Sequence, residues 1–174
     1  TNLEQVVATS CQLRALGKAL LVVPVPAKRR LYGAQAGRAV TLEMDNLYPG
    51  ITRRLSAAGV AWLDTLSILQ QASSSAPVFM RTDTHWSPWG ARVVAGGVAD
   101  VMALPAGQPF STVEYTVEHY QGDLLRYLPT SDGIGPRREE PLVRYQTAAD
   151  TGELDADALL GDVMPPVALV GTRY

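Results

Sequence analysis

The chain has 174 residues, of which 47% are hydrophobic, and its 15 basic and 17 acidic side chains give a formal net charge of −2. This composition suits one globular domain with a sizeable core, so we expect residues 1–174 to form a single domain. The weak negative charge gives no general electrostatic reason to bind nucleic acid, which is therefore not expected as a partner. No segment reaches the roughly 18 consecutive apolar residues of a membrane span.

The histidines and the single cysteine bear on whether the chain has a disulfide or a metal site. One cysteine, Cys11, excludes an intramolecular disulfide, and its place in a helical apolar pattern predicts a buried thiol. The two histidines and the cysteine lack clustered ligand spacing, which argues against a structural zinc site. We expect no metal and no cofactor.

The first part of the chain predicts helices alternating with short strands. Residues 2–16 carry apolar side chains at helical spacing, and residues 18–26 form a nearly continuous apolar run, typical of a strand covered on both faces. A polar loop containing Lys28 and Tyr32 should follow this strand at its carboxyl end. Ligands meet open α/β sheets in such loops, so both residues are candidates for substrate contact, although a solvated basic turn explains them equally well.

The middle of the chain continues this alternation. Residues 38–59 predict two helical pieces interrupted at Tyr48, Pro49 and Gly50, because proline in a helix interior removes a hydrogen-bond donor. Residues 60–65 predict a second short strand, followed by a short helix. Later strands are expected over residues 77–80, 110–120 (half-buried, from its alternating pattern), 141–146 and 167–170.

The stretch RTDTHWSPWGA, residues 81–91, is the strongest candidate for chemistry. Asp83 and His85 lie just before a helix start at Ser87 and Pro88, where a capping residue and a first-turn proline agree. A carboxylate beside an imidazole can fix its tautomer and stabilise its protonated form, as in the base half of a nucleophilic triad. The spacing alone is weak evidence, because such an aspartate commonly caps a turn while the histidine packs nearby.

The longer string DTHWSPWGA closely resembles the DTHW-x-P-x-GA signature of polysaccharide O-acetyltransferases related to the alginate acetylation proteins, an SGNH-hydrolase-like bacterial family. The resemblance implies that Asp83 and His85 are the acid and base of a Ser-His-Asp triad. It also implies a three-layer α/β/α domain with a mostly parallel sheet. The strand ending in Val-Pro-x-Pro and the GDL segment that begins at Gly122 resemble the same family. We expect Asp123 to cap a short helix rather than to take part in catalysis.

The end of the chain departs from this family. Where the family carries Gly-Thr-Ser-Tyr, with serine as the nucleophile, this sequence has Gly171, Thr172, Arg173 and Tyr174. Gly171, Thr172 and Arg173 would form the nucleophile and oxyanion loop, yet arginine stays protonated and has no lone pair available for attack. Thr172 is one position away from the expected nucleophile. We expect that the domain is truncated at its C-terminus.

The resemblance implies O-acetylation of an exported polysaccharide, such as alginate, in the bacterial periplasm. Trp86 flanks the turn, where an aromatic side chain either belongs to the core, which is the more frequent case, or shapes a substrate pocket. The resemblance leaves open whether a membrane-bound partner supplies the acetyl donor. Two other functions also remain open at this point. One is a non-catalytic carbohydrate-binding or assembly module on the same fold, which Arg173 favours, and the other is an acetylesterase, which differs in using water as the acceptor.

Overall fold

The computed structural model describes residues 2–34, 41–103, 110–127, 140–149 and 167–171. Short strands and longer helices alternate through most of this part of the chain. In chain order the elements are α1 (Asn2–Ala15), β1 (Leu21–Val22), α2 (Lys28–Tyr32), α3 (Leu42–Ala57), β2 (Ala61–Trp62), α4 (Thr65–Ala72), α5 (Pro88–Val101), β3 (Phe110–Tyr120), the 3-10 helix η1 (Asp123–Tyr127) and β4 (Glu140–Ala149).

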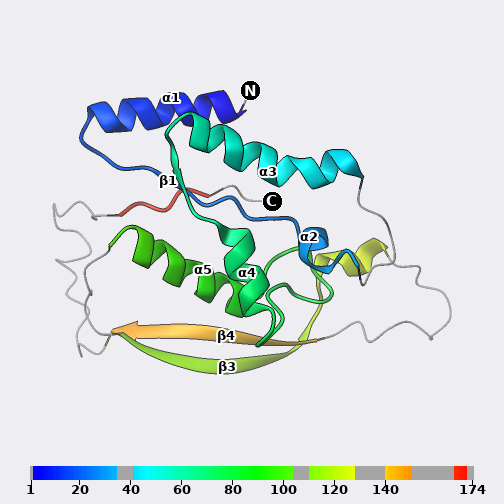
Figure 1. The fold of residues 1–174 in the computed structure, drawn as a ribbon. Helices are drawn as coiled ribbons and strands as arrows, with labels where there is room; N and C mark the ends of the chain where they lie inside the picture. The colour runs from blue at the N-terminus through cyan, green and yellow to red at the C-terminus, as the bar shows by residue number, and fades with distance from the viewer. Residues whose placement is uncertain (1, 35–40, 104–109, 128–139, 150–166, 172–174) are drawn as a thin grey trace.

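Helices lie on both sides of a strand layer. Figure 1 shows α1 and α3 on one side of β1, with α4 and α5 on the other side and the hairpin of β3 and β4 beyond α5. β1 and β2 pair in parallel, with Leu21 opposite Ala61 and Val22 opposite Trp62. β3 and β4 pair antiparallel. The α/β class and the parallel pairing expected from the sequence are confirmed.

Two of the predicted strands take other forms. Residues 77–80 form only one isolated bridge, between Phe79 and Trp86. Residues 167–170 run as an extended segment (red in Figure 1), without strand pairing among the described residues. The side chain of Leu169 is 96% exposed. An apolar run predicts a preference for burial, but a strand also requires a neighbouring backbone that accepts its hydrogen bonds.

The main core lies between α4, α5 and the segment that leads into the DTHW signature. Its five buried members are all apolar, and partly buried residues from α2, α4 and α5 pack around them. The five are Leu63, Leu69, Val78, Phe79 and Val94. The signature loop therefore starts from buried, well-anchored residues.

Two burial predictions are wrong. Cys11 is exposed on α1, and the residue of that helix that is buried is its neighbour Ser10. β3 has the predicted length, but its described residues 112–116 are all exposed. The helix layer contacts the hairpin mainly through β4, which leaves both faces of this part of β3 open to solvent. Among the described residues, no helix is long and apolar enough to cross a bilayer.

α3 runs without interruption through Pro49, contrary to the predicted break. Proline lacks the amide that would normally bond to the carbonyl of Asp45, four residues earlier. The guanidinium of Arg30 donates to that carbonyl at 2.7 Å and lies 3.8 Å from the Asp45 carboxylate. A donor from α2 thus replaces the missing helical one, which explains why the helix continues.

We expect Arg30→Met to lower the free energy of unfolding by about 2 kcal/mol, because it removes a charged donor from a backbone carbonyl that has no helical partner. Urea unfolding followed by circular dichroism would measure the change. Arg53→Met on the exposed face of the same helix is the matched control and should stay within about 0.5 kcal/mol of the parent. Equal losses in the two variants would contradict this account of Pro49.

Candidate active site

The DTHW loop is closed at its base like a small hairpin. Ser87 donates its backbone N–H to the carbonyl of Val78 at 2.9 Å, and Met80 donates to the carbonyl of His85 at 3.1 Å. Residues 81–84 project beyond these bonds. The loop is therefore anchored to the core at both ends, with Asp83 inside the loop and His85 at its closed base.

The helix start predicted at Ser87 is confirmed. The Ser87 side chain accepts a hydrogen bond from the backbone N–H of Gly90 at 3.0 Å, and α5 begins at Pro88. The same hydroxyl donates to the carbonyl of Pro77 at 2.7 Å. One side chain thus caps the helix and also ties it to the segment that enters the loop.

Asp83 and His85 contact each other directly. His85 Nδ1 lies 2.5 Å from Asp83 Oδ1, and the His85 backbone N–H donates to the same oxygen at 2.9 Å. The Asp83 side chain is 4% exposed and that of His85 is 54% exposed. The carboxylate is buried beneath the imidazole, which remains open on its outer side.

The second oxygen of Asp83 has its own donors. The Tyr120 hydroxyl donates to Oδ2 at 2.6 Å, and the backbone N–H of Asp123 donates to it at 3.1 Å. Burial raises the pKa of Asp83, but the hydrogen bonds from Tyr120, His85 and Asp123 outweigh this effect and hold the pKa well below its usual range. Asp83 is therefore a carboxylate at neutral pH.

The ionised state of Asp83 determines the protonation of the imidazole. A carboxylate only accepts hydrogen bonds, so Nδ1 of His85 must be the donor in their contact. In neutral imidazole this leaves the lone pair on Nε2, the nitrogen that does not face Asp83. The arrangement is suited to a general base that removes a proton from a group bound outside the loop.

The other residues predicted to contact substrate have structural partners here. The Lys28 ammonium donates to the carbonyls of Met80, Arg81 and Asp83 at 2.6, 2.9 and 3.0 Å. The Tyr32 hydroxyl accepts a hydrogen bond from the Val78 N–H at 3.2 Å, and its ring meets that of Phe79 edge-on.

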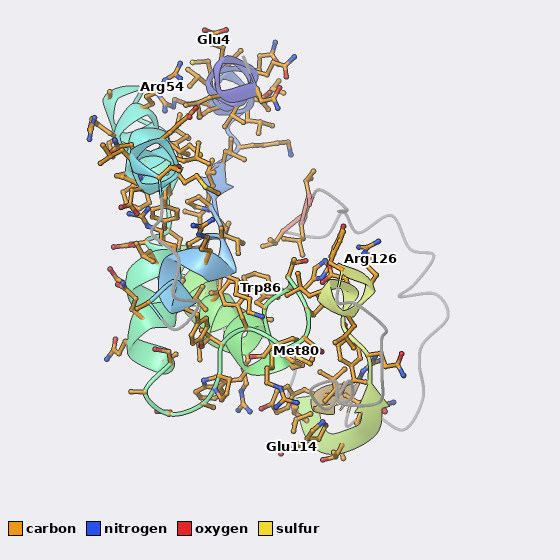
Figure 2. The ribbon with its side chains drawn as sticks, turned by 90° about the vertical axis from the view of Figure 1, so that its right-hand side faces the viewer. Glu4, Arg54, Met80, Trp86, Glu114 and Arg126 are labelled. Atoms are coloured by element: carbon orange, nitrogen blue, oxygen red, sulfur yellow. The ribbon has the colours of Figure 1, made fainter. Side chains whose placement is uncertain are left out.

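Trp86 is partly buried against the core and lies near the centre of the molecule in Figure 2. Substrate contact by Lys28, Tyr32 and Trp86 stays a prediction. Lys28 and Tyr32 have in addition a visible role in holding the loop and the segment that leads into it.

Two contributors to the site were not identified from the sequence as site residues. Tyr120 is the last residue of β3, and Asp123 begins η1, so both lie far along the chain from Asp83. The Asp123 carboxylate accepts hydrogen bonds from the backbone N–H and the hydroxyl of Thr84 at 2.8 and 2.6 Å. The prediction that this side chain caps a short helix missed its main partner, which lies in the DTHW loop. The resemblance of the GDL segment to the same family was the feature of the sequence that pointed to Asp123.

The nucleophile loop can be described only in part. Gly171 is exposed, whereas Thr172 and Arg173 lie outside the described residues. The approach of the nucleophile position to His85 therefore stays a prediction.

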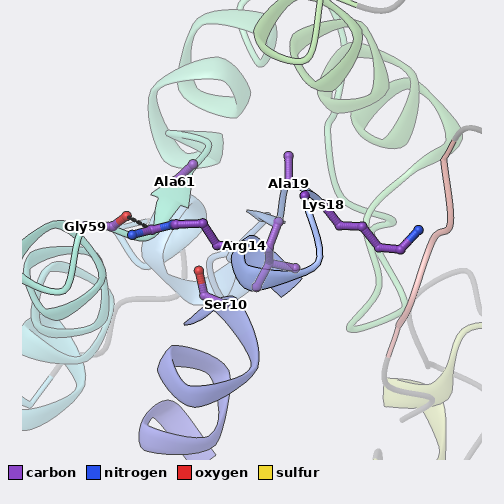
Figure 3. A pocket seen from close by; sticks show the side chains of 8 residues that line it. Ser10, Arg14, Lys18, Ala19, Gly59 and Ala61 are labelled. Atoms are coloured by element: carbon purple, nitrogen blue, oxygen red, sulfur yellow. Dashed lines mark hydrogen bonds between the residues drawn. The ribbon is translucent and has the colours of Figure 1, made fainter. Parts of the chain in front are cut away.

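A separate cavity of about 400 Å³ lies between the end of α1, the start of β1 and the turn before β2. Figure 3 shows Arg14 directed to the carbonyl of Gly59, which its guanidinium bonds at 3.1 Å, while Lys18 points away from it. The two cations therefore do not converge on one point. None of the residues that line the cavity belongs to the DTHW loop.

Gly122 allows the chain after β3 to approach the loop closely. A Cβ at this position would overlap the backbone of Thr82 and the amide of Asp83. We expect Gly122→Ala to lower the free energy of unfolding by about 2–3 kcal/mol through this overlap. Gly96→Ala is the control, because a Cβ there meets nothing within 4 Å and alanine favours the helix, so thermal unfolding should shift upwards. A neutral Gly122→Ala would contradict the close approach.

Comparison with known proteins identifies the family. The family model for the SGNH hydrolase-like domain of the acetyltransferase AlgX matches residues 1–174. The chain belongs to this family. The solved O-acetyltransferase domain of Pseudomonas putida AlgJ is similar to it with a TM-score of 0.76 and 30% sequence identity, over 86% of this chain and 56% of that one. The SGNH-like fold implied by the sequence resemblance is confirmed.

Curated relatives of this AlgX-family chain carry a more specific name. The probable alginate O-acetylase AlgJ of Pseudomonas aeruginosa is 37% identical over 179 residues, which cover 94% of this chain and 46% of the relative. The protein of the same name in Azotobacter vinelandii is 36% identical over 168 residues, or 89% of this chain and 42% of the relative. The chain thus spans about half the length of the curated relatives it matches.

Proposed function

We propose that the chain is a polysaccharide O-acetyltransferase domain acting on alginate or a similar exopolysaccharide. The observation that carries this proposal is the contact between the exposed imidazole of His85 and the buried, ionised carboxylate of Asp83. The names of the AlgJ relatives support the substrate class. By resemblance the domain works in the periplasm, with a membrane-bound partner as a possible source of acetyl groups.

The mechanism follows from the two protonation states of His85. Nε2 takes the proton of an attacking hydroxyl as that oxygen bonds to the acetyl carbon, and Asp83 stabilises the imidazolium that forms. The imidazolium then returns the proton to the departing group, which leaves an acetyl ester on the nucleophile. A sugar hydroxyl next attacks this ester, gives its proton to Nε2, and the nucleophile is released with that proton.

The residue at the family's nucleophile position is Arg173 in this chain. An arginine side chain cannot attack as this mechanism requires, because the guanidinium stays protonated. We therefore expect the chain as written to form no acetyl ester at this position, and we expect Arg173→Ser to supply the missing group. Amides near Gly171 would stabilise the oxyanion formed during attack.

The test is acetyl release from 4-nitrophenyl acetate by the chain, by Arg173→Ser and by the double variant with His85→Ala. Release by Arg173→Ser that the second substitution removes would support the proposal, and transfer to an alginate oligosaccharide, detected by mass spectrometry, would distinguish it from an acetylesterase. A folded Arg173→Ser variant without acetyl release would count against it.

Arg173 itself favours a second candidate function, a non-catalytic carbohydrate-binding or assembly module. Such a module would bind acetylated or unacetylated alginate with an affinity that His85→Ala leaves unchanged. Isothermal titration calorimetry with oligosaccharides would measure this affinity. Loss of binding in His85→Ala would instead indicate that the glycan lies over the Asp83 and His85 pair.

A further inference from the structure

The turn between β3 and η1, residues 120–123, contacts Asp83 and Thr84 of the DTHW loop. We propose that this turn is a positioning element of the reaction, in which Tyr120 orients the carboxylate of Asp83 and Asp123 orients the backbone between Asp83 and His85. The inference rests on the proposed function for its role in catalysis. Its structural part concerns only the geometry of the pair.

Among the described residues, the Asp83 carboxylate accepts two hydrogen bonds on each of its oxygens. Both donors to Oδ1 come from His85, and both donors to Oδ2 come from the turn, namely the Tyr120 hydroxyl at 2.6 Å and the Asp123 amide at 3.1 Å. A carboxylate held on one side only could rotate about its bond to Cβ. The turn therefore fixes the direction in which Oδ1 meets the imidazole.

Asp123 acts on the residue between the pair. Its carboxylate receives both the backbone N–H and the hydroxyl of Thr84, which fixes the peptide that links Asp83 to His85. The two oxygens of one carboxylate thus accept from the backbone and from the side chain of Thr84, which holds this residue in one orientation. A change in the position of Asp123 would move the backbone that carries the imidazole.

Backbone contacts dock the turn onto the loop. Gly122 donates its N–H to the Thr82 hydroxyl at 3.2 Å, and Leu124 donates to the Thr82 carbonyl at 3.0 Å. These bonds belong to the main chain of the turn and do not depend on the side chains of Tyr120 and Asp123. Substitution of either side chain should therefore leave the turn in place and remove only its positioning contacts.

Other roles for Asp123 can be distinguished from positioning. Ligand atoms of Asp83, His85 and Asp123 lie within 4.8 Å of one another, as metal ligands would, but all three already take part in hydrogen bonds with each other or with Thr84. Arg126 also lies 3.9 Å from the Asp123 carboxylate. A metal site or an ion pair would require the charge of Asp123, whereas positioning requires only its hydrogen-bonding geometry.

The experiment compares Tyr120→Phe, Asp123→Ala and Asp123→Asn with the unmodified chain. Asparagine can accept the Thr84 N–H and donate to its hydroxyl, so it preserves the geometry without the charge. The readout is the solvent exchange rate of the His85 Nδ1 proton, followed by NMR in the ¹⁵N-labelled chain and assigned by its loss in His85→Ala. We expect about tenfold faster exchange in Tyr120→Phe and Asp123→Ala, and little change in Asp123→Asn.

The second part of the experiment measures acetyl release by the same substitutions made together with Arg173→Ser. Tyr120→Phe and Asp123→Ala should lower kcat with KM nearly unchanged, and Asp123→Asn should restore most of kcat. If Arg173→Ser releases no acetate, the proposed function fails, but the exchange rates still test positioning. Unchanged exchange in folded Tyr120→Phe and Asp123→Ala would overturn the inference, as would an Asp123→Asn variant as defective as Asp123→Ala.

Discussion

Asp83→Asn, introduced together with Arg173→Ser, is expected to reduce acetyl release by about 10³–10⁴-fold while the fold is retained, which is the loss typical of a triad with its acid replaced by an amide. The reason lies in the donors around the carboxylate. His85 supplies donors on one side, and Tyr120 and the Asp123 amide supply donors on the other. An asparagine side chain has an accepting oxygen on one side and a donating NH₂ group on the other, so the NH₂ group must face a set of donors.

Either orientation of the new amide is harmful. If its NH₂ faces His85, Nδ1 must become an acceptor and the proton moves to Nε2, so the base loses its lone pair on the outer side. If its NH₂ faces the turn, it opposes the fixed N–H of Asp123. The comparison is made by steady-state kinetics on the single and double variants. Retention of most of the activity would mean that Asp83 does not set the tautomer of His85.

The same substitution should change how stability depends on pH. The pKa of Asp83 is held well below its usual range in the folded chain. Its contribution to stability is therefore fully present above the unfolded pKa of about 3.9, and it decreases as the pH falls below that value toward the folded pKa. Urea unfolding at several acidic pH values should show a shallower loss for Asp83→Asn than for the parent.

Lys28→Met is expected to lower the free energy of unfolding by about 2–3 kcal/mol, the scale of one to two charged hydrogen bonds. Its ammonium lies among three carbonyls of the DTHW loop, and it uses one donor for each. Removing the charge leaves these carbonyls facing one another without a cation between them. Chemical denaturation measures the loss, and the exchange rate of the His85 Nδ1 proton should rise with it.

Two further variants make the Lys28 prediction specific. Lys28→Arg should not restore stability, because a planar guanidinium cannot direct three donors from a single nitrogen. Lys18→Met changes an exposed lysine that lines the separate cavity, and it should be nearly neutral. If Lys28→Met unfolds like the parent but binds alginate more weakly, substrate contact is the better account of this residue.

The positions of Asp83, His85 and Ser87 could be predicted because their determinants are local. The capping serine, the first-turn proline and the DTHW signature lie within a few residues of one another, and the structure places them as expected for the helix start. The first helix and the length of β3 were also recoverable from the period of their apolar residues. The contact between Asp83 and His85 is consistent with the resemblance.

Other features depend on contacts between distant residues, which no local pattern encodes. Pro49 predicts a break in the helix. The helix continues because Arg30 in α2 donates to the carbonyl that proline leaves without a helical partner. In the sequence, Tyr120 is recognisable only as the end of a strand, and Asp123 only as the cap of a short helix. The folded chain brings both residues to Asp83. In the sequence, Lys28 looks like part of a solvated basic turn, because its carbonyl partners lie more than fifty residues further along the chain.

The short helix α2 links two parts of the molecule that are far apart in sequence. Lys28 contacts the DTHW loop and Arg30 contacts α3, with a single residue between them. A five-residue helix has too few internal hydrogen bonds to persist alone, so its conformation depends on both partners. Amides of the loop and of α3 should therefore gain or lose protection from hydrogen exchange together, as one cooperative unit.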